Sequence, residues 1–380
     1  MTITAYPDAA LRRPWAALPF WLSLTMVPVI WLGAVLGGAW VLLVPAYAWL
    51  GYSALDLLTG EEERNADPNR RDGLGWYRAI TLIWAPMQFV TLFGLIFYAT
   101  RADHLTPLAL WGLFFGVGVV CGTIGINYSH ELMHQKPRLD RWLGDILLSM
   151  VLYSHFRSEH LLVHHRYVAT PRDPVTARYN EGFHRFFPRV LWQCLTSALG
   201  AERDMLARRK LPAWHRSNPF WRYAALQGGM LALAMALGGW LGLVLFLVQA
   251  FTAIWQLELV NYVEHYGLTR RHLGDGKYEP VRPHHSWNSA QKASNWLLIN
   301  LQRHSDHHYK PDRPFPLLQT YGDDEAPQLP AGYPVMTAAA MVPPVWRRMM
   351  NPRVREWRRK HYPDIADWSA YKTASNPLPR

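Results

Sequence analysis

The sequence predicts an all-α membrane protein, built as a six-transmembrane-helix bundle with a histidine-rich cap on the cytoplasmic side. Of the 380 residues, 50% are hydrophobic and 19 are tryptophan, a composition that favours a membrane protein. The long apolar runs lie mostly before residue 130, whereas much of the remaining chain is rich in histidine and arginine. We therefore expect one membrane-embedded domain over residues 1–380.

Six apolar runs approach the length of about 20 residues that crosses a hydrocarbon core. They are residues 17–36, 40–58, 77–98, 108–128, 223–237 and 241–263. The glycine pairs at 37–38 and 238–239 separate the two spans of the first and the third hairpin. An even number of spans puts both termini on one side. Lysine and arginine are concentrated there, which by the positive-inside rule identifies the cytoplasm.

The polar remainder, residues 129–222 and 264–380, is expected to form the cap. Apolar residues between Phe186 and Leu199 recur at helical spacing beside arginines, which indicates either a helix on the membrane surface or an amphipathic helix packed on the cap. The formal charge of +11 is explained by anionic lipid headgroups, because the basic residues lie beside apolar spans and no nucleic-acid motif accompanies them. We expect a lipid bilayer as a partner and no nucleic acid.

Nine of the 17 histidines occur in groups whose spacing suits a metal site. Residues three or four apart on a helix leave the same face, so their imidazoles can converge on one point. Nine imidazoles overfill one metal ion and suit two, although imidazole alone does not distinguish zinc, copper and iron. The candidate ligands are His130, His134, His160, His164, His165, His265, His304, His307 and His308.

The string from His130 to His134 also reads as the HExxH motif of zinc metalloproteases, with Glu131 as general base. Such a site needs one further ligand, so a protease would leave most of the histidine pattern unexplained. We expect Glu131, Glu159, Glu264 and Asp306 to accept hydrogen bonds from ligand imidazoles instead. The two cysteines, Cys121 and Cys194, form no CxxC motif and predict no thiolate metal site.

Four strings occur in order along the chain. They are His-Glu-Leu-Met-His from His130, Glu-His-Leu-Leu-Val-His-His from Glu159, Asn-Tyr-Val-Glu-His-Tyr-Gly from Asn261, and Leu-Gln-Arg-His-Ser-Asp-His-His from Leu301. Over residues 40–360 the chain resembles the integral-membrane alkane 1-monooxygenases. The last two strings are specific, whereas the bare histidine boxes are shared with membrane fatty-acid desaturases and xylene monooxygenases. Met133 is a departure, because relatives commonly have glycine there.

The resemblance implies a non-haem di-iron centre, with two iron ions held by the nine histidines, that uses O2 to hydroxylate the terminal methyl of medium- to long-chain n-alkanes to 1-alkanols. It names rubredoxin, an acidic protein, as the electron donor, with an NADH-dependent rubredoxin reductase upstream, and the bacterial inner membrane as the location. A related desaturase or xylene-type hydroxylase is the alternative. A metal transporter without redox chemistry is more distant, because transporters place ionisable ligands at mid-membrane within their spans.

The fourth expected span suggests one end of a substrate pocket. If it is helical into the first histidine box, Thr123, Ile124 and Ile126 face the region above the metals. In the family a residue of the second span limits alkane length, and Ala48 is the position that matches. A small residue there would leave the far end of the pocket open to chains longer than octane. Ala48 could instead be an ordinary small residue at a helix contact.

Overall fold

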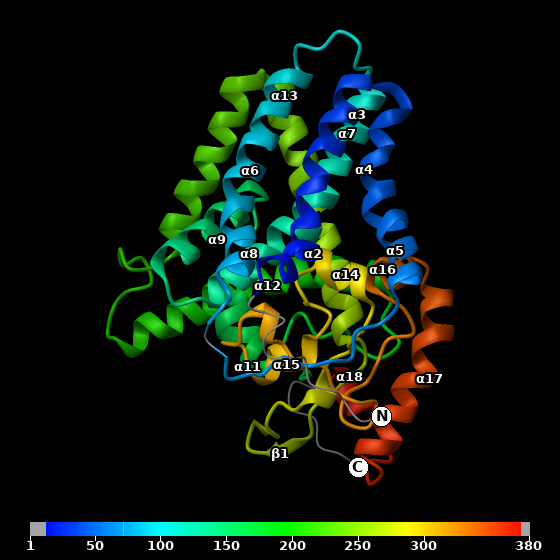
Figure 1. Cartoon of the computed structure of the whole chain (residues 1–380). Coiled ribbons are helices and arrows are strands. Elements are labelled where there is room, and N and C mark those ends of the chain that lie inside the picture. Colours follow the sequence, from blue (N-terminus) through cyan, green and yellow to red (C-terminus); the bar gives the residue numbers. More distant parts are fainter. Residues whose placement is uncertain (1–12, 71, 374–380) are drawn as a thin grey trace.

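The computed structural model describes residues 13–70 and 72–373. Figure 1 shows two parts: long helices gathered at one end of the molecule, and short helices and loops at the other. The two chain termini, which the sequence predicts to be cytoplasmic, lie outside the described residues.

Within the described residues, five helical segments are long and apolar enough to cross a membrane, which makes this a multi-pass membrane protein. They are Leu18–Leu36, Gly38–Thr59, Gly75–Ala99, Pro107–His134 and Phe220–His265. The first four correspond to the first four predicted spans. Their α-helices are α2 (Leu18–Trp21), α3 (Met26–Leu36), α4 (Leu43–Ala46), α5 (Tyr52–Thr59), α6 (Gly75–Ala99), α7 (Pro107–Val120) and α8 (Asn127–His134). Short 3-10 or π turns precede or interrupt them: η1 (Pro14–Ala16), η2 (Leu22–Thr25), η3 (Gly38–Leu42), η4 (Tyr47–Gly51) and η5 (Cys121–Ile126).

The fifth segment, α13 (Phe220–His265), has 46 residues and bends back on itself. A straight helix of that length would extend about 69 Å, far more than the roughly 30 Å of a hydrocarbon core. Gly239 breaks it with non-helical angles, φ 59° and ψ −153°. A β-carbon at Gly242 would lie 2.8 Å from the carbonyl oxygen of Ala234, although residues eight apart in a straight helix are about 12 Å apart. Figure 1 shows the two arms side by side.

Glycines bring the fourth segment against α13. A β-carbon added at Gly118 would lie 2.6 Å from the carbonyl oxygen of Gln249, and one at Gly122 would lie 2.5 Å from that of Ala253. Only glycine allows the two backbones to approach this closely. The contact holds η5 and α8, which follow α7, beside the end of α13 that carries His265.

The cap combines short helices with one small antiparallel hairpin, which the sequence did not predict. Its elements are α9 (Arg138–Met150), α10 (Phe156–Glu159), η6 (His160–His164), α11 (His165–Tyr167), α12 (Phe183–Arg208), β1 (His272–Gly274), β2 (Lys277–Tyr278), η7 (Pro283–His285), α14 (Lys292–Leu297), α15 (His304–Tyr309), η8 (Phe315–Leu317), α16 (Tyr333–Ala340), α17 (Pro343–His361) and α18 (Ala370–Thr373).

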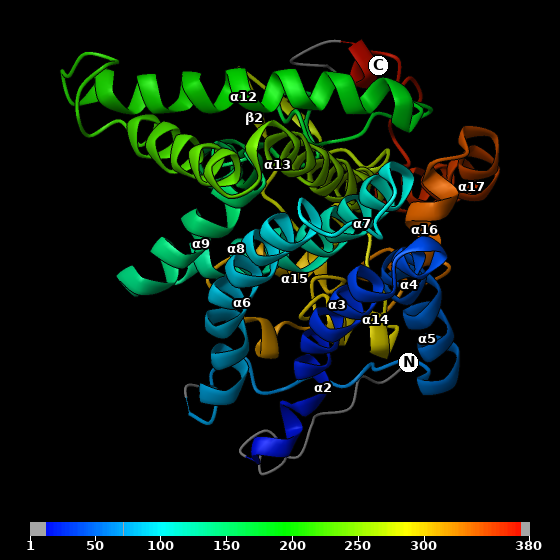
Figure 2. The same ribbon diagram turned by 90° about the horizontal axis from the view of Figure 1, so that it is seen from above.

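The longest cap helix, α12, is the one expected between Phe186 and Leu199. Figure 2 looks down on the molecule and shows α12 along its full length at one edge. One face buries Phe186, Val190 and Cys194 in the cap, while Trp192 on another face is 68% exposed. The helix therefore packs on the cap, and its exposed tryptophan is compatible with contact to a membrane surface.

Candidate metal centre

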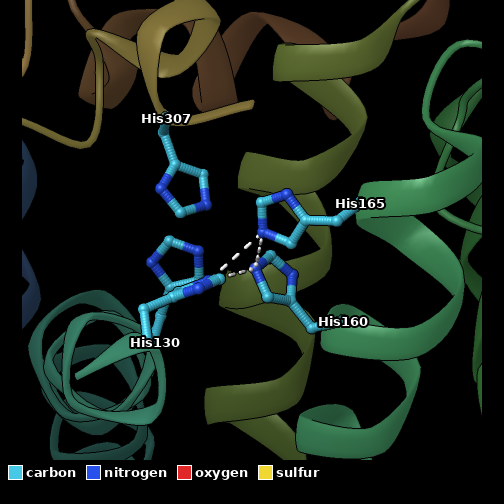
Figure 3. Close-up of side chains that lie close together, drawn as sticks. His130, His160, His165 and His307 are labelled. Atoms are coloured by element: carbon cyan, nitrogen blue, oxygen red, sulfur yellow. Dashed lines mark hydrogen bonds between the residues drawn. The ribbon is translucent and has the colours of Figure 1, made fainter. Parts of the chain in front are cut away.

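The structure brings all nine predicted histidines together in two groups. The first group takes its members from α8, η6, α11 and α15, and its candidate ligand atoms lie within 4.8 Å of one another. Figure 3 shows the labelled imidazoles pointing toward one another, with His160 and His165 on one helical segment and His130 and His307 on two others. The five members are His130, His134, His160, His165 and His307.

The second group comes from η6, the end of α13 and α15, and meets the same 4.8 Å limit. Its four members, all buried, are His164, His265, His304 and His308. Two of the four histidine strings, those that begin at Glu159 and Leu301, are thus divided between the groups. His160 and His165 face the first group while His164 faces the second, and α15 likewise sends His307 one way and His304 with His308 the other.

A π-helical turn explains how the second box is divided. Residues 160–164 form η6, in which hydrogen bonds connect residues five apart instead of four. The wider turn aligns His160 with His165, whose Nε2 atoms are 2.9 Å apart. His164 lies on another side of the turn, where its Nε2 is 3.2 Å from that of His308.

The spacing of the imidazole nitrogens fits ligands that share one metal ion. With metal–nitrogen bonds of about 2.1 Å, neighbouring ligands lie about 3.0 Å apart at 90° and about 3.4 Å apart in a tetrahedron. In the first group, Nε2 of His134 is 3.1 Å from that of His160 and 3.2 Å from that of His165. In the second group, Nε2 of His304 is 3.1 Å from that of His265 and 3.0 Å from that of His308. The five candidate ligands of the first group also exceed the four of a tetrahedral zinc site.

Burial prepares these imidazoles for metal binding. Desolvation lowers the pKa of five candidate ligands outside the membrane-spanning segments well below the usual value, and neighbouring imidazoles lower it further. A neutral imidazole offers a lone pair, so no proton has to leave these side chains at neutral pH when a metal binds. They are His160, His165, His304, His307 and His308.

One candidate ligand is oriented by a carboxylate that the sequence reasoning did not select. Nδ1 of His164 lies 2.9 Å from Oδ2 of Asp173, and both side chains are buried. Asp173 also accepts hydrogen bonds from the Thr176 hydroxyl and the Val175 amide. Carboxylate–imidazole–metal arrangements of this kind fix the tautomer of the ligand. The available signal was an aspartate nine residues after His164 in the sequence.

The four carboxylates expected to support the ligands lie close to them but differ in their contacts. Oε2 of Glu264 is 3.3 Å from Nε2 of His304, the nitrogen that faces the second group. Glu159 is fully buried, and neither of its oxygens has a hydrogen-bond partner. Glu131 accepts from Gln135 at 2.8 Å.

Asp306, which follows His304 in the fourth box, is held by groups outside the two histidine clusters. The Tyr321 hydroxyl donates to Asp306 at 2.6 Å, the Gln319 amide donates at 2.9 Å, and the Arg313 guanidinium forms a short ion pair with it. Asp306 thus anchors the helix that carries three candidate ligands to the loop that follows it.

A small cavity of about 30 Å³ adjoins both histidine groups. Its wall includes His130 and His160 from the first group and His164 and His304 from the second. Of the four predicted pocket residues, Thr123 is in this wall, whereas Ala48, Ile124 and Ile126 are buried elsewhere in the core. The sequence reasoning did not select the remaining wall residues Gly122, Asn127, Phe156, Leu257, Val260, Asn261, Leu298 and Leu301, nor assign Glu264 to the wall.

Comparison with known proteins identifies the family. Residues 104–340 match the family model described as fatty acid desaturase. The chain is 38% identical to alkane 1-monooxygenase 2 of Pseudomonas aeruginosa over 350 residues, which cover 86% of this chain and 91% of the relative. It is 36% identical to alkane 1-monooxygenase 2 of Alcanivorax borkumensis over 370 residues, which cover 92% and 94%.

The chain belongs to the alkane 1-monooxygenase family. The resemblance noted in the sequence is thereby confirmed. A more distant relative is the hydroxylase component of a xylene/toluene monooxygenase from Pseudomonas putida, 27% identical over 346 residues, which cover 88% of this chain and 89% of the relative. As an alkane 1-monooxygenase family member, the protein carries every histidine that the resemblance assigns as a ligand, arranged in two adjoining groups.

Proposed function

We propose that this protein hydroxylates the terminal methyl group of medium- to long-chain n-alkanes, using O2, at two iron ions held by its two histidine groups. One observation carries the proposal: five and four convergent imidazoles adjoin one buried cavity in a membrane protein of the alkane 1-monooxygenase family. The first group would hold one ion and the second group the other. Bound iron would supply the oxidising power that an unactivated C–H bond requires.

The chain's own part is to position the alkane and to keep the site dry. Leu257, Val260 and Leu298 give the cavity an apolar wall for a terminal methyl group. The hydroxyl of Thr123 in the same wall is buried without a hydrogen-bond partner, so it is available to bind the hydroxyl of the alcohol product. At about 30 Å³ the cavity has room for a small group only, so an alkane must displace side chains to place the rest of its length.

The membrane arrangement follows from the helix lengths. We infer that each arm of α13 crosses the bilayer once, because a single crossing cannot accommodate 46 residues. This gives six spans in a bacterial inner membrane, with both termini and the cap on the cytoplasmic side. Substrate then arrives from the bilayer, where alkanes dissolve, and electrons arrive from the cytoplasm.

Electrons must come from another protein. The two cysteines are buried and unpaired, and the sequence carries no flavin or nicotinamide motif. We propose rubredoxin as the donor, itself reduced by an NADH-dependent reductase.

Product analysis tests the proposal. Purified protein supplied with octane, 18O2, rubredoxin, reductase and NADH should form 18O-labelled 1-octanol, and metal analysis should find about two irons per chain, as two histidine groups require. His307→Gln should abolish product and lower the iron content. His215→Gln, at a partly exposed loop position outside both groups, is the matched control. Zinc in place of iron, or no 1-octanol, would refute the proposal.

The same experiment separates the alternative. A desaturase would release an alkene or unsaturated acyl product without incorporating oxygen, and a xylene-type hydroxylase would prefer an aromatic methyl group. The similarity to the xylene/toluene relative keeps this alternative open, but its 27% identity is well below the 38% found with an alkane 1-monooxygenase.

A further inference from the structure

A second cavity, of about 230 Å³, lies directly behind one of the candidate metal ligands. Asp173 lines this cavity, and the same carboxylate accepts a hydrogen bond from Nδ1 of His164. One side chain therefore separates the cavity from the second histidine group. Residues of α17 and α18 complete the wall, and Figure 1 shows α18 and the C-terminal half of α17 at the end of the molecule away from the long apolar helices.

The wall of this cavity carries uncompensated positive charge. Three arginines line it, of which Arg189 is paired with Glu181 at 2.8 Å. Within residues 13–70 and 72–373, Arg178 and Arg358 form no ion pair. The guanidinium of Arg358 instead lies 4.6 Å and 4.4 Å from the ring centres of Tyr179 and Trp368.

Both of these arginines are partly desolvated. Burial lowers the pKa of the Arg178 guanidinium and lowers that of Arg358 to about 10, so both remain charged at neutral pH at some energetic cost. Nε of Arg358 is buried without a hydrogen-bond partner. A negatively charged group that enters the cavity would compensate the charge of the two guanidinium groups and accept a hydrogen bond from Nε of Arg358.

The hydrogen-bonding groups of the wall also favour an anion. Thr269, a wall residue, is 8% exposed, and its hydroxyl has no hydrogen-bond partner among the described residues. The carboxylate in the wall, Asp173, already accepts from His164 and Thr176. The charged donors of Arg178 and Arg358 therefore face no free carboxylate in the wall, which suits a carboxylate or phosphate ligand and disfavours a cation.

We propose that this cavity, called here the arginine cavity, receives a carboxylate side chain of the acidic electron-donor protein, which docks there and delivers electrons beside His164. The inference rests on the proposed function, because hydroxylation with O2 consumes two electrons that this chain cannot store in its cysteines. Each time the donor protein docks, it is oxidised by one electron, and the metal site at the two histidine groups would be reduced by that electron. No bond is made or broken in this transfer. The positively charged wall complements an acidic protein, and the cavity lies one side chain away from the candidate ligand His164. These two observations favour the electron donor over a lipid headgroup as the occupant.

Binding of rubredoxin to charge-reversed variants tests the inference. The dissociation constant for oxidised rubredoxin is measured with both the metal-free and the iron-loaded protein at low salt. We expect Arg178→Glu to weaken binding by about tenfold or more and Arg178→Lys to weaken it much less, because charge pairs at a docking site control affinity. Arg209→Glu, at an exposed position in the turn after α12, is the matched control and should change binding less than about twofold. Thermal unfolding of each variant verifies that the fold is intact.

Inorganic phosphate serves as a second probe. Phosphate that competes with rubredoxin for wild type, and no longer binds Arg178→Glu, supports the inference. Phosphate binding that is lost in Arg178→Glu while rubredoxin affinity stays at the wild-type value would overturn it, because the cavity would then hold only a small anion.

The outcomes for the two proposals remain distinguishable. If wild type forms 1-octanol and Arg178→Glu binds rubredoxin as tightly as wild type, the docking inference fails and the proposed function stands. If wild type forms no 1-octanol, the proposed function fails, and the binding measurements still decide whether an acidic protein docks at the arginine cavity.

Discussion

Replacing Asp173 with asparagine should selectively remove metal from the second histidine group. The carboxylate of Asp173 accepts from three donors: Nδ1 of His164 at 2.9 Å, the Thr176 hydroxyl at 2.7 Å and the Val175 amide at 3.1 Å. In Asp173→Asn the oxygen can stay with Val175, but the new NH2 group then faces two hydrogen-bond donors. His164 would have to accept at Nδ1 and carry its proton on Nε2, the nitrogen that faces the other ligands.

The expected loss can be estimated from this contact. Removing an outer-shell partner of a metal-binding histidine typically costs 10- to 100-fold in metal affinity, or about 1.4 to 2.7 kcal/mol. The wrong tautomer places the result at the upper end of that range. Iron-loaded Asp173→Asn dialysed against a chelator should fall from about two irons per chain to about one, because the first group does not contact Asp173.

Two comparisons make the experiment decisive. Asp140→Asn removes another buried carboxylate, which pairs with Arg78 instead of a histidine, and should lower stability while the iron content stays at the wild-type value. Mössbauer spectra should show that the iron remaining in Asp173→Asn occupies one kind of site. Retention of both irons in Asp173→Asn with unchanged chelator resistance would refute the tautomer reasoning.

Three further outcomes are expected. Ala48→Trp should shift the preferred substrate from dodecane toward octane, as the family resemblance implies, although Ala48 lies outside the small cavity; an unchanged chain-length profile would mean that Ala48 only packs helices. The unfolding temperature of the metal-free protein should fall as pH falls from about 7 to about 5, because histidines gain protons near pH 6.5 in the unfolded chain while the buried imidazoles stay neutral in the folded one. An unfolding temperature that does not change over this pH range would contradict the lowered pKa of the buried imidazoles. Rubredoxin-driven turnover should fall as salt rises, because screening acts over about 8 Å at physiological ionic strength, and salt-independent turnover would exclude electrostatic docking.

The sequence predicted which histidines come together because their signal is local. Spacings of three and four residues place imidazoles on one helix face wherever a helix forms, as α8 and α15 illustrate. The division into two groups was not predictable in the same way. It depends on the π turn at His160–His164, and single-residue changes in helical hydrogen bonding leave no mark in hydrophobic periodicity.

The substrate pocket was harder to predict for a related reason. Thr123, Ile124 and Ile126 were selected by assuming a regular helix up to His130, but residues 121–126 form the π turn η5, and of these three residues Thr123 alone lines the cavity. Most other wall residues, such as Leu257 and Leu298, come from segments more than 100 positions away. Such contacts depend on how α13 and the cap pack, which no local pattern encodes.

The distribution of the ligands also explains why membrane and cap form one structure. The first group joins α8, at the end of a span, to η6, α11 and α15 of the cap, and the second joins the end of α13 to η6 and α15. Each bound metal would therefore cross-link a membrane-spanning segment to the same two cap elements. Because a metal site of this kind does not exist in the unfolded chain, the free energy of metal binding adds to that of folding. The small cavity that adjoins both groups therefore keeps its shape only while the ligands are held together. The contacts that hold the cap on the bundle thus also determine where the substrate methyl group would lie.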